Sequence, residues 1–341
     1  MLRFDSDYLE TAAPEIIARF SKIGEEQNTA YGFDPYSESA ALKIAEACGK
    51  PNALVKFLVG GTQSNALLID ALLKRYEGVI AATTGHISLH EAGAVEYCGH
   101  KVIALPGQEG KLHAASVDQY LLDFYADETH EHMTQPGLIY ISQPTEYGTL
   151  YTKAELTALR AVCDRFQLKL YLDGARLGYA LTSKDADFNL EDIAALCDAF
   201  YIGGTKVGAL FGEAAVIPDP QLLPHFFTQI KQHGALLAKG WLLGLQFDTL
   251  FSDGLYFRLA SHANEMAAIL KDGLKEKGYT FYIDSPTNQQ FIVMENRAMA
   301  ALAEKVGFGF WEKYDENHTV IRFATSWATK EEDIKKLLSF L

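Results

Sequence analysis

The stretch from residue 169 to residue 206, KLYLDGARLGYALTSKDADFNLEDIAALCDAFYIGGTK, decides the fold that we expect for this chain. An apolar run opens it, another closes it, and a helical pattern at 190–196 lies between them. Two strands joined through a helix form a crossover, which places them parallel in one sheet. Asp173 and Lys206 each follow the carboxyl end of one strand, the edge at which open α/β sheets bind ligands.

The same alternation extends through the first 250 residues. Further apolar runs lie at 53–59, 79–82, 101–105, 137–142 and 214–217, and helical patterns lie at 37–48 and 153–166. Strands that alternate with helices indicate crossover connections. We therefore expect an α/β fold with a mostly parallel sheet covered by helices.

The pattern changes after Gly240. A long helical stretch at 255–277 is followed by short strands at 290–294, 309–314 and 319–324. Thr329 stands three residues before Glu332, a spacing typical of a capping box, so we expect Thr329 to open the last helix. These elements predict a small α+β C-terminal domain, residues 251–341. It packs on a large domain, residues 1–250, whose first 14 residues lie near the small domain.

The composition favours a cytoplasmic protein that binds a small molecule. The formal net charge of −14 would repel nucleic acid and anionic membranes. The four cysteines are widely separated, which favours a reducing compartment. The N-terminus carries acids where a signal peptide needs a basic start, and no apolar run is long enough to span a bilayer.

A pair of glycines follows the predicted strand at 53–59, in the sequence Gly60-Gly61-Thr62-Gln63-Ser64-Asn65. Free backbone N–H groups at a helix start favour an anion, and glycine allows a phosphate to approach closely. Gly61 and Thr62 are therefore candidates for a phosphate cradle. A plain strand-to-helix turn is the alternative, because the full Walker and dinucleotide patterns are both absent.

Three further side chains indicate which ligand this cradle would bind. Asp173 is placed either to serve as an anion under a cofactor or to cap a helix. Arg176 is either a surface group or a partner for a substrate carboxylate. Lys206 follows two glycines, although a lone lysine in a loop is usually surface charge. A phosphate cup, an acid for a ring nitrogen and an amine for an aldehyde are together what pyridoxal 5'-phosphate requires.

His86 and His90 lie four residues apart, so a metal site that includes Glu91 has to be considered. The order HxxxHE differs from HExxH, and no third histidine follows at a useful distance. We therefore expect no metal, and we expect His86 to stack on the cofactor ring.

With these residues assembled, the chain resembles the threonine aldolase and β-eliminating lyase family of pyridoxal-phosphate enzymes. Their fold is the aspartate-aminotransferase-like one, also called PLP-dependent transferase-like or fold type I. The motifs that carry the resemblance are Phe4-Asp5-Ser6-Asp7, Tyr31-Gly32-Phe33-Asp34-Pro35, Gly61-Thr62-Gln63-Ser64-Asn65, His86 with Glu91-Ala92-Gly93, and Asp173-Gly174-Ala175-Arg176.

The resemblance implies a role for each site residue. Asp173 would pair with the pyridine nitrogen, and Lys206 would form an imine with the cofactor aldehyde. Thr205 would help to hold the phosphate. The substrate carboxylate would be bound by Ser6, Arg176 and Arg322, with Arg176 counted in the cofactor site as well. Members of the family assemble as homodimers or homotetramers, so we expect the same here.

Two departures from the family pattern bear on the reaction. Aldolases usually carry Glu-Asn-Thr-His-Asn where this chain has residues 143–147, QPTEY, which puts Glu146 in place of a histidine. The surroundings of the lysine, residues 203–207, also differ from the usual Leu-Ser-Lys-Gly. We expect retro-aldol cleavage of a β-hydroxy amino acid such as L-threonine or L-allo-threonine, with Glu146 or His86 as the catalytic base.

Other activities remain open at this stage. The alternatives are a β-eliminating lyase, an aminotransferase or a racemase with the same cofactor. A binding protein that keeps the fold without catalysis is a further alternative.

Overall fold

The computed structural model describes residues 1–341, and its larger part is built on a seven-stranded sheet. In spatial order the strands are β2 (Leu54–Leu58), β8 (Glu213–Ile217), β7 (Ala199–Gly203), β6 (Lys169–Asp173), β5 (Gln135–Ser142), β3 (Glu77–Ala82) and β4 (Val102–Leu105). All neighbours from β7 to β4 run parallel. Only β8 runs antiparallel to its neighbours, β7 and β2. The prediction of a mostly parallel sheet is confirmed.

The direction of β8 follows from the loop that precedes it. Residues 204–212 are too few for a helical crossover, so the chain turns back beside β7 in the antiparallel sense. Because β8 opposes both neighbours, β2 runs in the same direction as β7. The carboxyl ends of β2, β3, β5, β6 and β7 therefore lie at one edge of the sheet, and β8 begins at that edge.

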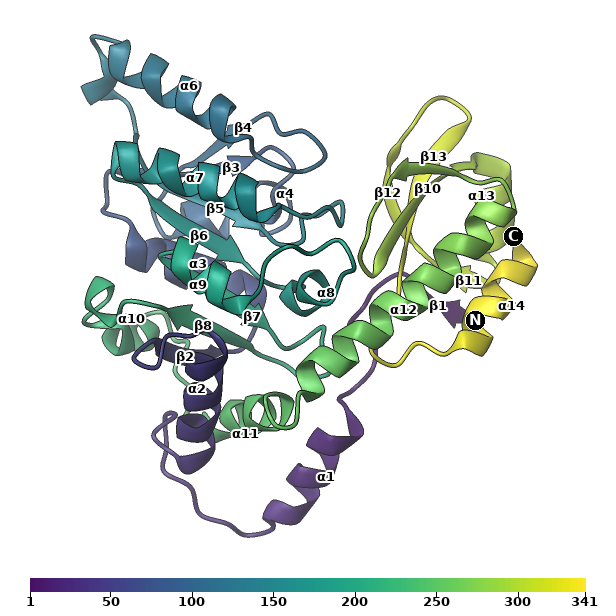
Figure 1. Ribbon diagram of the computed structural model, residues 1–341, viewed down its shortest axis with the longest axis horizontal. Helices are drawn as coiled ribbons and strands as arrows, with labels where there is room; N and C mark the ends of the chain where they lie inside the picture. The colour runs from purple at the N-terminus through teal and green to yellow at the C-terminus, as the bar shows by residue number, and fades with distance from the viewer.

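Helices cover both faces of this sheet (Figure 1). The helices of this part of the chain are α1 (Pro14–Ile23), which packs on α11 away from the sheet, α2 (Pro35–Ala47), α3 (Gly61–Leu72), α4 (His86–Leu89), α5 (Ala94–Tyr97), α6 (Ala114–Ala126), α7 (Lys153–Phe166), α8 (Leu177–Leu181), α9 (Leu190–Leu196), α10 (Phe226–Gln232) and α11 (Trp241–Leu250), with short 3-10 turns η1 (His130–His132) and η2 (Pro220–Leu222). Alternate strand residues belong to two different buried clusters. Leu170 and Leu172 join one and Tyr171 joins the other, so both faces of the sheet are packed.

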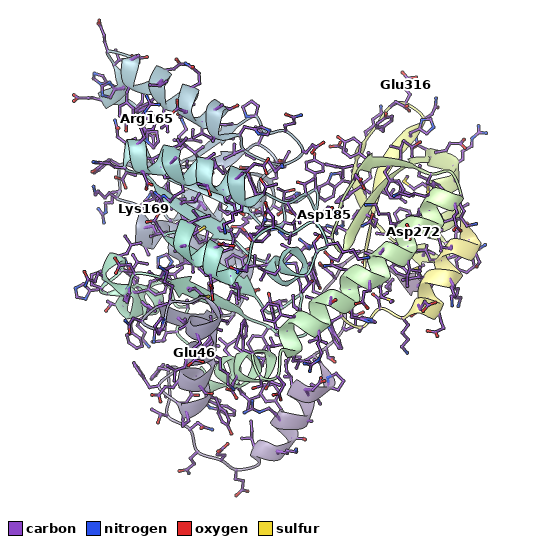
Figure 2. All side chains as sticks on the ribbon, in the orientation of Figure 1. Glu46, Arg165, Lys169, Asp185, Asp272 and Glu316 are labelled. Atoms are coloured by element: carbon purple, nitrogen blue, oxygen red, sulfur yellow. The ribbon has the colours of Figure 1, made fainter.

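A second, antiparallel sheet follows in the chain. Its strands in spatial order are β12 (Gly309–Lys313), β13 (His318–Ala324), β10 (Gln289–Glu295) and β9 (Thr280–Ile283). Three helices belong to this part: α12 (Leu255–Glu276), α13 (Asn296–Ala303) and α14 (Glu331–Phe340). Side chains from both parts extend into the space that the ribbons leave between the two sheets, and Glu316 stands at the outer tip of the β12–β13 hairpin (Figure 2).

The N-terminus lies among these C-terminal elements (Figure 1). Strand β1 (Leu2–Arg3) pairs in parallel with β11 (Val306–Gly307), and Phe4 belongs to the buried cluster of the small sheet. The segment that follows thereby reaches the edge where the two sheets meet. The domain division at residue 250 stays a prediction.

The predicted capping box at Thr329 is wrong. Helix α14 begins at Glu331, and its N-cap, Lys330, makes no side-chain cap. The Thr329 hydroxyl instead accepts a hydrogen bond from the Ser326 N–H at 2.8 Å. The hydroxyl that a capping box needs is therefore engaged in a local turn.

Candidate active site

A cavity of about 680 Å³ opens where the carboxyl edge of the large sheet faces the small sheet. Nine of the ten predicted site residues line it: Gly61, Thr62, His86, Glu146, Asp173, Arg176, Thr205, Lys206 and Arg322. Ser6 does not line the cavity, although Tyr8, two residues later, does. The loops after five strands thus converge as the parallel topology predicts.

Asp173, the last residue of β6, is buried and accepts four hydrogen bonds. The Asn65 amide and the Tyr140 hydroxyl donate to Oδ2 at 2.8 and 2.7 Å. The Tyr201 hydroxyl and a backbone N–H donate to Oδ1 at 2.5 and 2.9 Å. Burial raises the pKa of Asp173, but the attraction of His86 and these hydrogen bonds outweigh it, so the pKa lies below its usual value. Asp173 is therefore a negative charge fixed at the cavity wall, and it does not cap α8.

His86 is held by a buried acid. Its Nδ1 lies 2.7 Å from Glu91 Oε1, and the Asn65 amide donates to the same oxygen at 2.7 Å. Since a carboxylate only accepts, Nδ1 carries the proton and Nε2 is left for other contacts. Burial lowers the pKa of His86. The hydrogen bond to Glu91 and the charge of Glu146 raise it by more, so the pKa lies above its usual value. Asn65 links this pair to Asp173, a connection that sequence analysis missed.

The predicted phosphate cradle forms the start of α3. Its N-cap, Gly60, supplies no side-chain cap, and the N–H groups of Gly61, Thr62 and Gln63 have no partner within the chain. The first turn contains no acid. Free donors at the positive end of a twelve-residue helix, beside the cavity, are the chemistry that a phosphate requires.

Lys206 and Thr205 lie in the loop between β7 and β8. The Lys206 Nζ is 5.4 Å from the centre of the Tyr8 ring, and this lysine forms no ion pair with a carboxylate. The Thr205 hydroxyl donates to Glu213 Oε1 at 2.8 Å. Glu213 is buried at the start of β8 and also lines the cavity. Sequence analysis gave it no role.

The two candidate arginines differ in their partners. Arg176 donates from Nε and Nη2 to Asp7 at 2.7 and 2.9 Å, so this edge of its guanidinium is committed. Arg322 binds the side chain of Gln289 and a backbone carbonyl, and its buried Nε has no partner. The Ser6 hydroxyl is likewise buried without a partner. Arg322 and Lys206 are thus the two cations of this cavity that have no carboxylate partner.

Glu146 stands in the loop after β5 and is half-buried. It raises the pKa of His86 and of Arg176, so its carboxylate acts on both across the cavity. The next residue, Tyr147, packs edge-on against Trp311 of β12 with 5.4 Å between ring centres. The small sheet therefore contributes aromatic rings, those of Phe310 and Trp311, to the lining of the cavity.

A lysine, an ionised acid, a histidine and a helix start with free donors line one cavity, and this set defines the site of a pyridoxal-phosphate enzyme. The family of β-eliminating lyases matches residues 4–297. The low specificity L-threonine aldolases of Pseudomonas sp. (strain NCIMB 10558) and Pseudomonas aeruginosa are 30% and 29% identical to this chain, over 98% of it and 95% of each relative. The chain belongs to the β-eliminating lyase family.

Solved structures agree with this assignment. The threonine aldolase of Leishmania major superposes with a TM-score of 0.96 at 42% identity, over 99% of this chain and 98% of that one. Aspartate aminotransferase from Thermus thermophilus, at 16% identity and a TM-score of 0.72, shares the fold. The predicted family, fold type and pyridoxal-phosphate dependence are confirmed. No helix has the length and apolar character to cross a membrane.

Proposed function

We propose that this protein cleaves β-hydroxy-α-amino acids, such as L-threonine or L-allo-threonine, into glycine and an aldehyde. Both Pseudomonas relatives, which this chain covers almost completely, are named for an aldolase of low specificity. The observation that carries the proposal is the cavity itself. It combines Lys206 and Asp173 with an arginine that lacks a carboxylate partner and with a carboxylate, Glu146, that can take a proton.

The residues present fit pyridoxal phosphate, which when bound supplies an electron sink for the pair released at the substrate Cα. The free N–H groups of Gly61 and Thr62, together with the Thr205 hydroxyl, hold the phosphate. Asp173 keeps the ring nitrogen protonated, because its carboxylate is buried, ionised and fixed by four donors. His86 would lie against the ring. Lys206 would hold the aldehyde carbon through its amine, the group that a substrate amine would replace.

Arg322 binds the substrate carboxylate in this proposal. A half-buried guanidinium whose Nε has no partner is stabilised by an anion that enters the cavity. Ser6, the third residue expected at this carboxylate, does not line the cavity, so no contact in the structure supports that role. Arg176 contributes through Nη1 and the second proton of Nη2, because Asp7 occupies the edge formed by Nε and Nη2.

The base that removes the β-hydroxyl proton is Glu146. No group in the structure donates a hydrogen bond to its carboxylate, and it lines the same cavity as the other site residues. His86 is the second candidate, and only its Nε2 is available, because Nδ1–H is bound to Glu91. Proton removal by a positioned side chain is worth on the order of a hundredfold or more in rate.

We also propose that the chain works as a homodimer or homotetramer in a reducing cytoplasm. Large apolar side chains such as Phe33, Leu42 and Tyr97 are exposed, and a second copy would cover them. The four cysteines are free thiols.

The test is a product analysis with pyridoxal phosphate present. L-threonine should yield equal amounts of glycine and acetaldehyde. L-serine and L-cysteine should yield little pyruvate. Pyruvate and ammonia as the main products would instead establish β-elimination, for which the cavity holds the same cofactor residues. Lys206→Ala should abolish the reaction, and Lys184→Ala, which removes an exposed lysine, should not change it. Activity that survives in Lys206→Ala, or no product from any amino acid, would refute the proposal.

A further inference from the structure

Glu213 is a buried acid at the cofactor edge to which the proposed mechanism gives no role. It is the first residue of β8, the strand that runs opposite to its neighbours and so begins where they end. It lies opposite Leu58 in β2 and Gly203 in β7. Glu213 therefore stands between the strand that leads to the phosphate cradle and the strand that leads to Lys206.

The hydrogen bonds of Glu213 tie it to the predicted phosphate ligand. The Gly204 N–H donates to Oε2 at 3.0 Å, and the Thr205 hydroxyl donates to Oε1 at 2.8 Å. The Gly212 N–H donates to the same hydroxyl oxygen at 3.0 Å, and the Gly212 carbonyl oxygen, 3.4 Å away, is a longer and weaker alternative acceptor for its proton. A hydroxyl has one proton and two lone pairs. While Glu213 is ionised, the proton of Thr205 points to Glu213, and a lone pair is left toward the cavity.

Such an arrangement opposes phosphate binding. A phosphate oxygen that approached Thr205 would meet a lone pair, and a buried negative charge would stand behind it. If Glu213 is protonated, its O–H donates to Thr205 and the Gly212 N–H fills the second lone pair. The hydroxyl proton of Thr205 is then released from Glu213 and can be donated to the phosphate, a stronger acceptor than the Gly212 carbonyl 3.4 Å away.

We propose that Glu213 is a positioning residue of the cofactor site: it takes up one proton from solvent when the phosphate binds, and its hydrogen bond then turns the Thr205 hydroxyl toward the phosphate. The inference rests on the cofactor assignment and not on the reaction that the enzyme catalyses.

The surroundings of Glu213 support a proton there at neutral pH. Burial raises the pKa of Glu213 to about 7, although Lys206 and the hydrogen bond from Thr205 lower it. Asp173 at the end of β6 also raises it. The other titratable groups that sense Glu213 are the phenols of Tyr171, Tyr201 and Tyr256, which are buried and neutral.

The experiment measures binding of pyridoxine 5'-phosphate by calorimetry between pH 6 and pH 8.5. This ligand has the phosphate but no aldehyde, so Lys206 cannot bond to it. Glu213→Gln keeps the shape and donates permanently from its amide to Thr205. The ratio of the wild-type Kd to the Glu213→Gln Kd should be near 1 at pH 6 and about tenfold or more at pH 8.5, because the ratio cancels the ionisation of the ligand itself. A ratio that does not change with pH would overturn the proposal.

Two further variants separate the hydrogen-bond relay from simple charge repulsion. In a Thr205→Val background the effect of Glu213→Gln at pH 8.5 should shrink below about threefold, and in Thr205→Ser it should persist. An effect that stays tenfold in the valine background would refute the relay. Glu312→Gln removes another acid of the cavity and should leave the pH profile unchanged. If the aldolase proposal alone is wrong, these binding profiles still hold while no aldehyde is formed.

Discussion

Arg176 and Asp7, which lie 169 residues apart in the chain, form a buried ion pair beside the cavity. Asp7 also accepts a hydrogen bond from the Asn288 amide at 2.9 Å. Burial raises the pKa of Asp7, but the charge of Arg176 and these hydrogen bonds lower it to about 2. The pair joins the N-terminal segment to the loop after β6, and it sets the position of one arginine of the site.

Asp7→Asn should destabilise the protein by roughly 3–5 kcal/mol, because it leaves the Arg176 guanidinium buried without a counter-charge. Urea unfolding measures this loss. Asp5→Asn, two residues away, is the matched control: Asp5 pairs with the exposed Arg3, and a surface pair contributes only about 0–1 kcal/mol. Equal losses in the two variants would contradict the role given to the buried pair.

The local part of the site could be predicted from the sequence. Asp173, Lys206 and the glycine turn each follow an apolar strand, and parallel strands bring their carboxyl ends to one edge regardless of the side chains elsewhere. The residue types then indicate the cofactor, because few ligands need an amine, an acid and a phosphate cup together. Arg322 was assigned from family resemblance, and the structure places it at the cavity.

The partners of these residues could not be predicted. Nothing in the pattern of Asp7 distinguishes a buried ion pair from surface charge, because its partner is distant in the sequence. Glu213 follows Gly212 and precedes two alanines. An acid at the start of a strand usually faces water, so this pattern does not predict burial. Its burial depends on β8 lying between β2 and β7, which the predicted strand runs did not specify.

Glu213→Gln should stabilise the cofactor-free protein at alkaline pH. The pKa of Glu213 is raised from 4.5 to about 7 on folding, so the folded state holds a proton that the unfolded state has lost between these values. The stability of the wild type therefore falls relative to Glu213→Gln as pH rises from about 4.5 to 7, and then stays level. Urea unfolding at pH 5 and pH 8.5 should show that the advantage of the variant grows by roughly 2–3 kcal/mol.

Glu312→Gln serves as the control for this measurement, because Glu312 is only half-buried. Asp7 does not interfere, since its stabilising charge is present above about pH 4 and is lost only as pH falls toward 2. An advantage of Glu213→Gln that is equal at both pH values would contradict the raised pKa.

Arg322→Gln should raise KM for the amino acid about tenfold or more, because a hydrogen bond to a charged group is worth roughly 1.5–3 kcal/mol. The variant should still fold, since Arg322 has no carboxylate partner that would be left unpaired. Arg176→Gln is the instructive comparison. It leaves Asp7 buried without its cation, so its main effect should be a loss of stability and not a change in KM. Unchanged KM in a folded Arg322→Gln enzyme would exclude Arg322 as the carboxylate ligand.

Glu146→Gln should lower kcat for L-threonine by about a hundredfold or more and leave KM within a fewfold, because the amide keeps the shape of the side chain but cannot accept the β-hydroxyl proton. Binding of pyridoxal phosphate, measured by its absorbance, should be unchanged. The residues proposed to hold the cofactor are the phosphate cradle, Asp173 and Lys206, and Glu146 is not among them. His86→Asn tests the other candidate base. If kcat is normal in Glu146→Gln and falls only in His86→Asn, the proton goes to His86 Nε2, and Glu146 then acts only by raising the pKa of that histidine.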